Sequence, residues 1–543
     1  MSKLTDLLED SIKRFENEKS FADYPGKGIS YFDVAFEIRK LHNMFKALDI
    51  NKQDKIALVG KNCSNWAVVY LAAITYGAVI VPVLPDFNPD DIKHIAHHSE
   101  SAVLFAETGL LDDIDPELNH ILKAVISLEN FRTELIKEKY KKAVEEINKN
   151  TEKSEFLIND LNYGHSEEND PAALAYTSGT TGFSKGVILT HGNLNGNVVF
   201  AAKNLKLERG ERILSFLPLA HAFGCAFEFL FPFTCGCFIS FLNKTPSPKT
   251  ILKAFDDVKP ALILSVPLIM EKIYRKKIKP RLDDPKIKFL LKIPGISNLI
   301  YKSIKKSLRK SFGGNYKEIV IGGAPLHTDV EEFFNKTGLR FTVGYGMTEC
   351  GPLISYAPWN NRSTGGCGKI VSGMKVKIVK AAKGDPVGEI VVKGTHCMSG
   401  YYKNKEATDA VIDKNGWLHT GDIGFIDENQ NIHIRGRSKN MILGSGGQNI
   451  YPEEIEAKVN GFDIVSESVI YEKDGLILLQ VYPDFTMLDK KNVEEKEIKK
   501  MFEKLRREIN MKLPDYSKIS RVKVRNIEFE KSPTKKIKRH LIE

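Results

Sequence analysis

The sequence predicts an α/β fold in which a mainly parallel sheet is covered by helices on both faces. Apolar strands are expected at residues 56–59, 77–83 and 102–106, with helices at residues 66–76 and 91–98 between them. Strands that are apolar throughout and alternate with helices are typical of parallel sheets. A chain of 543 residues also exceeds the size at which one hydrophobic core stops growing. We therefore expect at least two domains.

Residues 213–242 form a long apolar stretch in which Glu228 is the single formally charged residue. A membrane-spanning helix needs about 20 predominantly apolar residues with few interruptions. Here Pro218, Gly224, Pro232 and Gly236 interrupt the stretch. The pattern favours a buried, kinked core segment over a membrane span.

Composition limits the class of protein. The net charge of +10 indicates anionic ligands or an anionic surface. Nucleic acid is not expected as a partner, because the sequence shows no zinc-finger spacing, basic zipper or ordered basic-aromatic array. The seven scattered cysteines argue for a reducing compartment. The first residues include acids and no apolar core of a secretory signal, so we expect a cytoplasmic protein.

Residues 176–186, YTSGTTGFSKG, follow an apolar run and are rich in hydroxyl groups and glycines. Glycines let successive backbone N–H groups converge on an anion, and the hydroxyls and Lys185 add further donors. The stretch is not a Walker A loop, because the spacing from Gly179 to a Gly-Lys-Ser/Thr group is absent. From these residues alone, a polar surface loop and a phosphate-binding loop both remain open.

The stretch TSGTTGFSKG resembles the signature of the adenylate-forming (AMP-binding) superfamily, which includes acyl-CoA synthetases. Five further stretches match in order, so the resemblance spans roughly residues 31–539. It implies a large N-terminal domain of layered α/β sheets with a β-barrel-like subdomain, residues 1–438, and a small mobile α+β C-terminal lid, residues 439–543. It also assigns the phosphates of ATP to Thr177, Ser178, Gly179, Thr180, Thr181, Gly182 and Lys185.

Two stretches match the motifs that surround adenine in that superfamily. The resemblance of Gly322–Leu326 places Gly323, Ala324 and Pro325 beside adenine. In Gly344–Glu349, it implies that Tyr345 stacks on adenine next to Gly346, that Thr348 contacts the α-phosphate, and that Glu349 helps to hold magnesium. Carboxylate oxygens suit this hard cation, which usually takes one or two carboxylates plus substrate phosphates.

Residues 417–424, WLHTGDIG, resemble the ribose-binding motif, in which Asp422 accepts hydrogen bonds from both ribose hydroxyls. Arg437, fifteen residues further on, is also placed at the ribose by the resemblance. Between them, residues 424–434 read as a hairpin with an Asp-Glu-Asn-Gln-Asn turn, which returns Arg437 towards Asp422. A surface ion pair is the alternative interpretation.

The end of the chain matches the mobile lid of the family. Lys439 falls at the hinge, and residues 444–454 resemble the loop that receives coenzyme A, with Gly446, Gly447 and Gln448 as contacts. Residues 530–539 resemble the terminal catalytic-lysine motif, and its Lys-x-x-Arg spacing selects Lys536. Departures from the motif at Glu530, Ser532 and Lys535 leave Lys535 as a competitor.

The acyl pocket is expected near residues 217–223, which resemble the second core motif of the family. His221 is either a satisfied core histidine or part of the pocket, together with Phe223. Relatives that use acetate carry tryptophan at the position of Gly346, so a glycine there implies room for a longer acid.

Residues 271–312 form a basic insertion, and its second half places Ile300, Ile304 and Leu308 at helical spacing among basic residues. This is either a solvated helix or a helix that lies on an anionic membrane. A similar insertion occurs in the longer-chain members of the family.

Together these residues imply a ligase most like long-chain fatty acid–CoA ligases. The predicted reaction joins a medium- or long-chain fatty acid to coenzyme A through acyl-AMP, with ATP and Mg²⁺. The alternatives are an acyl-carrier-protein ligase, an aryl-CoA ligase and a non-enzymatic lipid-binding adaptor. The acid and the oligomeric state are left open.

Overall fold

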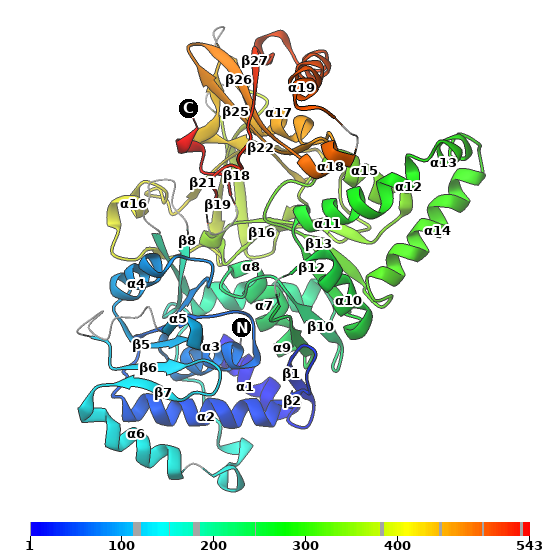
Figure 1. Cartoon of the computed structure of the whole chain (residues 1–543). Coiled ribbons are helices and arrows are strands. Elements are labelled where there is room, and N and C mark those ends of the chain that lie inside the picture. Colours follow the sequence, from blue (N-terminus) through cyan, green and yellow to red (C-terminus); the bar gives the residue numbers. More distant parts are fainter. Residues whose placement is uncertain are drawn as a thin grey trace.

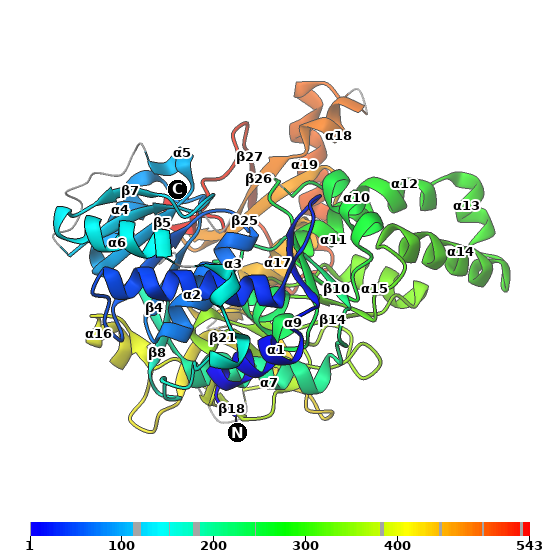
Figure 2. The same cartoon turned by 90° about the horizontal axis from the view of Figure 1, so that it is seen from below.

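The computed structural model describes residues 2–111, 121–150, 152–177, 185–244, 246–380, 385–444, 448–490, 493–532 and 536–542. The N-terminal part of the chain contains two large sheets with helices on their faces, and a smaller domain lies at the C-terminal end (Figures 1 and 2). The fold is therefore α/β, with a large N-terminal domain of mixed sheets and a small α+β C-terminal domain, as predicted.

The predicted parallel sheet is confirmed. Its strand order is β20-β9-β8-β4-β3-β5-β6-β7, and β8, β4, β3, β5 and β6 run parallel. All residues of β4 and β5 are buried, as their apolar sequences require. The strands are β3 (Lys55–Val59), β4 (Val79–Val83), β5 (Ser101–Ala106), β6 (Ala124–Ser127), β7 (Thr133–Ile136), β8 (Pro171–Thr177), β9 (Lys185–Thr190) and β20 (Gly400–Tyr401).

Helices cover this sheet where the sequence predicts them. The Cys63 side chain caps α3, and Gly77 ends it in the left-handed conformation with φ +88°. Asn88 caps α4 through the N–H of Asp91. The helices in this part of the chain are α1 (Leu4–Arg14), α2 (Tyr31–Ala47), α3 (Ser64–Tyr76), α4 (Pro89–His98), α5 (Thr108–Leu111) and α6 (Glu138–Asn150).

The second sheet has the order β14-β13-β12-β10-β11-β1-β2. Its strands are β1 (Lys19–Asp23), β2 (Ile29–Ser30), β10 (Arg212–Ser215), β11 (Phe238–Phe241), β12 (Leu262–Ser265), β13 (Glu318–Ile321) and β14 (Phe341–Val343). Helices α7 (His191–Asn204), α10 (Pro248–Val258) and α15 (Thr328–Thr337) connect its strands or precede them.

Residues 213–242 form a buried, kinked segment, as predicted. After β10 the chain runs through α8 (Ala222–Gly224), a π-helix (Cys225–Leu230) and α9 (Phe231–Thr234) to β11. Every residue of the π-helix is buried. In the described parts of the chain, no helix combines the length and the apolar character needed to span a membrane.

Smaller antiparallel sheets follow along the chain. One has the order β15-β16-β17, with β15 (Tyr345–Gly346), β16 (Leu353–Tyr356) and β17 (Lys369–Ile370). Another has the order β18-β19-β21-β22, with β18 (Met374–Val379), β19 (Gly388–Gly394), β21 (Leu418–Ile426) and β22 (Ile432–Arg437). The short helix α16 (Lys405–Asp409) lies between β20 and β21 in sequence.

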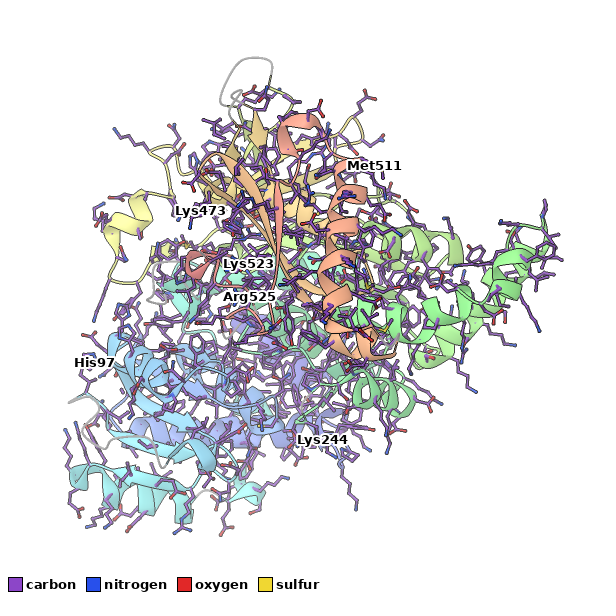
Figure 3. The ribbon with its side chains drawn as sticks, turned by 45° about the horizontal axis from the view of Figure 1, so that its top comes forward. His97, Lys244, Lys473, Met511, Lys523 and Arg525 are labelled. Atoms are coloured by element: carbon purple, nitrogen blue, oxygen red, sulfur yellow. The ribbon has the colours of Figure 1, made fainter. Side chains whose placement is uncertain are left out.

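The C-terminal domain has its own hydrophobic cluster, built from residues between Ile450 and Ile519. Its elements are β23 (Ile442–Leu443), β24 (Asn449–Ile450), α17 (Pro452–Val459), β25 (Val465–Lys473), β26 (Leu476–Pro483), α18 (Phe485–Lys490), α19 (Glu495–Asn510) and β27 (Arg521–Val524). Figure 3 marks Lys473 beside the β25–β26 turn and Met511 at the C-terminal end of α19. Because this cluster is separate from the core of the large domain, the small domain packs as a unit.

The basic insertion is helical. It comprises α11 (Pro267–Ile273), a π-helix (Tyr274–Ile278), α12 (Lys279–Leu282), α13 (Pro285–Leu290) and α14 (Ile296–Ser311). Residues 279–311, which we call the arm, project from the body in both views of the ribbon (Figures 1 and 2). The C-terminal end of α14 packs against the body through buried Leu308, whereas Phe289 and Leu299 are 67% and 66% exposed.

Candidate active site

The predicted phosphate-binding loop joins two adjacent strands. Thr177 ends β8, and Lys185 begins β9 directly opposite it in an antiparallel pair. The Lys185 ammonium lies 5.0 Å from the centre of the Tyr401 ring, a distance within the range of cation–π attraction. Ser178, Gly179, Thr180, Thr181 and Gly182 lie outside the described residues.

The predicted ribose site is formed by the β21–β22 hairpin, whose register pairs Asp422 with Arg437. Arg437 Nε lies 2.7 Å from Asp422 Oδ1, and its Nη1 donates to the Thr420 carbonyl at 3.2 Å. The Tyr345 hydroxyl donates to Asp422 Oδ2 at 2.6 Å. The expectation that the hairpin returns Arg437 to Asp422 is confirmed.

Burial dominates the electrostatics of Asp422. It raises the pKa of this carboxyl, although Arg437 and the Tyr345 hydroxyl act in the opposite direction by stabilising the carboxylate. Burial and the neighbouring Asp422 also raise the pKa of Tyr345, so the phenol keeps its proton and donates. The Asp422 carboxyl group, a hydrogen-bond acceptor, is thus held in a fixed orientation beside the aromatic ring of Tyr345.

Glu349 and Thr348 lie on a short 3-10 helix, Thr348–Cys350, that follows β15. The Glu349 Oε1 atom accepts a hydrogen bond of 2.8 Å from the Tyr401 hydroxyl. Throughout the ranges that the structure describes, no group of three or more His, Cys, Asp and Glu residues is placed to hold a metal. Glu349 offers one carboxylate here, and magnesium usually takes one or two carboxylates plus substrate phosphates, so its predicted role as the metal residue stays a prediction.

Lys536 comes from the C-terminal domain and reaches this site. Its ammonium is within electrostatic range of Asp422, Glu349 and Arg437, and burial and Arg437 lower its pKa while the two carboxylates raise it. The protein around the ammonium desolvates it in part, although residue 536 as a whole is exposed. Its backbone N–H donates to the Ser532 hydroxyl at 3.2 Å. Lys535, the competing candidate, lies outside the described residues.

His221 lies at the same place. Burial lowers its pKa to about 4, and the positive charge of Lys536 acts in the same direction. The imidazole is therefore neutral at physiological pH. Phe223 follows it, and a Cβ placed on Gly322 would lie 3.1 Å from the Phe223 ring. Gly323, Ala324 and Pro325 form the exposed turn after β13, where Gly323 has φ +86°.

Gly346 has a role in the backbone that the sequence did not indicate. A Cβ at this position would lie 2.2 Å from the Pro352 carbonyl oxygen and 2.9 Å from its carbonyl carbon. The glycine is needed where β15 and β16 approach each other across an irregular register. A bulky residue at 346 would displace backbone, so it is a poor probe of acyl-chain length in this chain.

Only some of the residues assigned to coenzyme A and the hinge are among the described residues. Gly446 and Gly447 lie outside the described residues, whereas the Gln448 carbonyl accepts the Gly444 N–H at 2.8 Å. Lys439 is exposed on a 3-10 turn, Ser438–Asn440, directly after β22. The roles assigned to these residues stay predictions.

Sequence reasoning missed Tyr401, which contacts both Glu349 and Lys185. It lies 52 positions from Glu349 in a two-residue strand, and nothing in its local sequence indicates that contact. Glu228 was also missed, although a lone acid in a long apolar stretch is a usable signal. Its Oε2 accepts the backbone N–H groups of Phe216 and Leu217 at 3.0 Å each, and so supports the segment that leads to His221.

Taken together, the geometry gathers the residues predicted to bind the nucleotide at one place, where the small domain meets the large one. A buried carboxylate and an arginine form one end of it, a carboxylate suited to magnesium lies nearby, and a lysine from the small domain completes it. This is the arrangement expected of an enzyme that activates a substrate with ATP.

Comparison with known proteins identifies the family of this chain. Residues 8–402 match the family described as AMP-binding enzyme. A long-chain-fatty-acid–CoA ligase of Mycobacterium bovis is 28% identical over 498 residues, covering 84% of this chain and 78% of that protein. 4-Coumarate–CoA ligase 1 of Arabidopsis thaliana is 29% identical over 491 residues, covering 87% and 81%. The chain therefore belongs to the family of AMP-binding enzymes.

Solved structures share the fold over the whole chain. ATP-bound MatB from Rhodopseudomonas palustris superimposes with a TM-score of 0.78 at 21% identity and covers 100% of this chain and 98% of its own. The o-succinylbenzoate coenzyme A synthetase from Bacillus subtilis, solved in complex with ATP and magnesium ion, has a TM-score of 0.75 at 19% identity, with coverage of 99% and 98%. These likenesses show that the chain shares the fold of these proteins over its whole length.

Proposed function

We propose that this chain, an adenylate-forming acyl- or aryl-CoA ligase, activates a medium- or long-chain fatty acid. The carboxylate of the acid would attack the α-phosphorus of ATP, giving acyl-AMP and pyrophosphate. The thiol of coenzyme A would then attack the acyl carbonyl, lose its proton and release AMP. The observation that carries the proposal is the convergence of Lys536 from the small domain with Asp422, Arg437 and Glu349 from the large one.

In the first step negative charge moves from the α-phosphate towards pyrophosphate. Lys536 would offset that charge, because its ammonium lies within electrostatic range of Asp422 and Glu349, and the resemblance assigns Thr348 to the α-phosphate. Asp422 and Arg437, which contact each other, would hold the ribose. Tyr345, whose hydroxyl bonds to Asp422, would lie against adenine. Magnesium held by Glu349 would neutralise part of the phosphate charge when bound. Positioning supplies most of the acceleration in this reaction class.

We further propose that residues 439–543 act as the lid and turn about Lys439 between the two steps. In the present orientation Lys536 occupies the site. The glycine-containing loop that carries Gly446, Gly447 and Gln448 is assigned to coenzyme A. A turn of the lid would move Lys536 out of the site and bring this loop into it. Such lid motions gate many enzymes.

The choice of a fatty acid rests on the surroundings of His221. Its neighbours in sequence, Ala220 and Ala222, help to line a small apolar cavity. The other lining residues are Tyr70, Pro82, Ala173, Ala175, Leu189, Leu194, Leu219, Cys225 and Ala226. Its open volume of about 10 Å³ is too small for a chain, so the acid has to widen it. The small alanine side chains and the neutral imidazole favour an uncharged aliphatic tail over a polar one.

A larger side chain in the lining should narrow this cavity and shift the preference of the enzyme towards shorter acids. We expect Ala222→Leu to lower the rate with the longest acids by about 10-fold relative to short ones, because each excluded methylene removes about 0.8 kcal/mol of burial. The measurement is pyrophosphate release with saturated acids of graded length. Ala201→Leu, a buried alanine on α7 outside the cavity lining, is the control. An identical length profile for Ala222→Leu and wild type would contradict this placement.

Two alternatives use the same first step. An acyl-carrier-protein ligase would transfer the acyl group to a holo carrier protein, and an aryl-CoA ligase would prefer aromatic acids. Pyrophosphate release on aliphatic and aromatic acids, with coenzyme A or holo carrier protein as the acceptor, separates them from the main proposal. If the protein is a non-enzymatic lipid-binding adaptor, it releases no pyrophosphate from ATP with any acid.

We propose the cytoplasm as the location, in line with the free state of all seven cysteines.

The arm is proposed as a peripheral contact with an anionic membrane. Its exposed apolar residues are Phe289 in α13 and Leu299 in the first turn of α14. Helix α13 lies at the projecting end of the arm (Figure 1). At its base, a surface cavity of about 360 Å³ is lined by Asp256, Lys259, Lys306, Arg309, Lys310, Gly313 and Gly314. Apolar side chains combined with a dense positive charge suit insertion among anionic headgroups.

Removing charge from the arm should weaken vesicle binding. We expect Lys302→Gln, Lys305→Gln and Lys306→Gln together to lower affinity for phosphatidylserine-containing vesicles by about 100-fold, because each basic residue contributes about 1 kcal/mol near such a surface. Vesicle co-sedimentation measures it. Triple replacement of Lys139, Lys141 and Lys142 on α6 is the matched control. Equal binding to purely zwitterionic vesicles would contradict the proposal.

A further inference from the structure

Residues 275–279, which lead into the arm, contact the C-terminal domain at a point distant in sequence from both Lys439 and Lys536. Arg275 lies in the π-helix after α11, and Lys279 begins α12. Four residues apart on consecutive helical turns, they lie on the same side of the segment. Both reach the loop between α17 and β25, residues 460–464.

The contact is made by charge and by a backbone hydrogen bond. Lys279 Nζ forms an ion pair with Asp463 Oδ2, and Arg275 Nη1 lies 3.6 Å from Asp463 Oδ1. Arg275 Nη1 also donates to the Gly461 carbonyl at 3.0 Å. The side chains are 20% exposed for Arg275, 26% for Lys279 and 27% for Asp463, so water screens the pairs only in part. One carboxylate of the small domain is thus held by two cations of the large one.

Shape reinforces the contact. A Cβ on Gly461 would lie 2.7 Å from both Cε1 and Nε2 of His327, so the glycine lets the loop close over the imidazole. His327 is itself fixed, because its side chain caps α15 and its backbone N–H donates to Glu271 at 3.1 Å. Nearby, Asp329 lies 4.0 Å from Arg275. The loop therefore seats on a rigid surface of the large domain.

We propose that Arg275, Lys279 and Asp463 are positioning residues for the first half-reaction, forming a latch that holds the small domain where Lys536 lies in the site. The inference rests on the proposed two-step function, because it concerns the orientation of the lid in each step. When the domain turns to present the coenzyme A loop, Asp463 leaves Arg275 and Lys279. The latch thus stabilises one of two orientations.

The strength of the latch suits this role. A partly exposed ion pair shifts an equilibrium by about 2- to 5-fold, and the pairs together by about 3- to 10-fold. A shift of this size favours the orientation with Lys536 in the site and still allows the small domain to turn. If each half-reaction needs one orientation, the ratio of the two rates follows the equilibrium constant between the orientations, whichever is more populated at the start.

The test measures both half-reactions separately in the full-length enzyme. The first is single-turnover formation of acyl-AMP from ATP and a fatty acid without coenzyme A, and the second is acyl-CoA formation from supplied acyl-AMP. We expect Asp463→Ala to lower the ratio of the first rate to the second by about 3- to 10-fold. Lys279→Met should give part of that fall. The double variant should be no lower than Asp463→Ala, because both changes remove the same contact.

Asp515→Ala is the matched control. Asp515 also forms an ion pair with a lysine, Lys518, but within the small domain, so its loss should leave the ratio unchanged. General destabilisation lowers both rates alike and leaves the ratio unchanged as well. An unchanged ratio in Asp463→Ala therefore overturns the latch.

Hydrogen exchange gives a second readout that needs no catalysis. In Lys279→Met we expect faster exchange in the peptide that contains Gly461 and Asp463, because the large domain covers it for less of the time, and no change in the peptide that contains Asp515. Unchanged exchange at Gly461 also overturns the latch. A wild-type enzyme that forms no acyl-AMP from any acid refutes the proposed function, and normal catalysis with no effect of these variants refutes the latch alone.

Discussion

Replacing Lys536 by alanine is expected to lower the rate of acyl-AMP formation by about 100- to 1,000-fold and to leave thioester formation from supplied acyl-AMP nearly unchanged. Removing one preformed group that stabilises a developing charge has this order of effect. Lys536 is the described lysine of the small domain that reaches Asp422 and Glu349. Under the proposed turn of the lid, Lys536 leaves the site before the second step, so its loss should not slow that step.

The measurement is pyrophosphate release for the first step and acyl-CoA formation from synthetic acyl-AMP for the second. Lys535→Ala is the control that decides between the two lysines that the terminal motif leaves open. An equal fall of both rates in Lys536→Ala would remove it from the catalytic role. A large effect of Lys535→Ala on the first step alone would transfer that role to its neighbour.

Replacing Asp422 by alanine should lower kcat/KM for ATP by about 100-fold. Hydrogen bonds to a charged acceptor contribute about 1.5–3 kcal/mol, and this carboxylate is assigned two ribose hydroxyls. It is almost fully buried, and its loss also leaves Arg437 and the Tyr345 hydroxyl without their partner.

Deoxynucleotides show whether the lost energy belongs to the ribose. Wild-type enzyme should prefer ATP to 2′-deoxy-ATP and 3′-deoxy-ATP, whereas Asp422→Ala should treat the three nearly alike. Asp427→Asn is the control, since Asp427 belongs to the same hairpin but bonds to His433 and Asn431. Undiminished discrimination in Asp422→Ala would show that other residues bind the ribose.

Much of the fold follows from local sequence. The strands at residues 56–59 and 102–106 and the helices between them are found where the apolar pattern predicts them. The hairpin that pairs Asp422 with Arg437 was also predictable, because a polar turn between two alternating strands fixes which residues face each other. The buried course of residues 213–242 followed from its glycines and prolines.

Other features depended on contacts between distant parts of the chain. Tyr401 meets Glu349 because β20 joins the edge of a sheet at β9, and no local pattern encodes that pairing. The approach of β16 makes a glycine at position 346 a requirement of the backbone, which the local sequence does not reveal, and its assignment to the acyl pocket stays a prediction. Glu228 accepts a backbone hydrogen bond from the segment before His221. It does so from a π-helix, and the sequence alone does not reveal that this helix is of the π type.

By itself the sequence determined the layered α/β plan, the order of the motifs and the residue types of the site, because strand patterns, turns and short signatures are local. Tertiary structure decided which of these residues meet. Asp422 and Lys536 lie 114 positions apart in number, and their approach depends on how the small domain packs on the large one. The contact of Arg275 and Lys279 with Asp463 has the same origin. Such contacts depend on the shape and charge of the surfaces of two separately packed domains. A local stretch of sequence does not determine how those two surfaces meet.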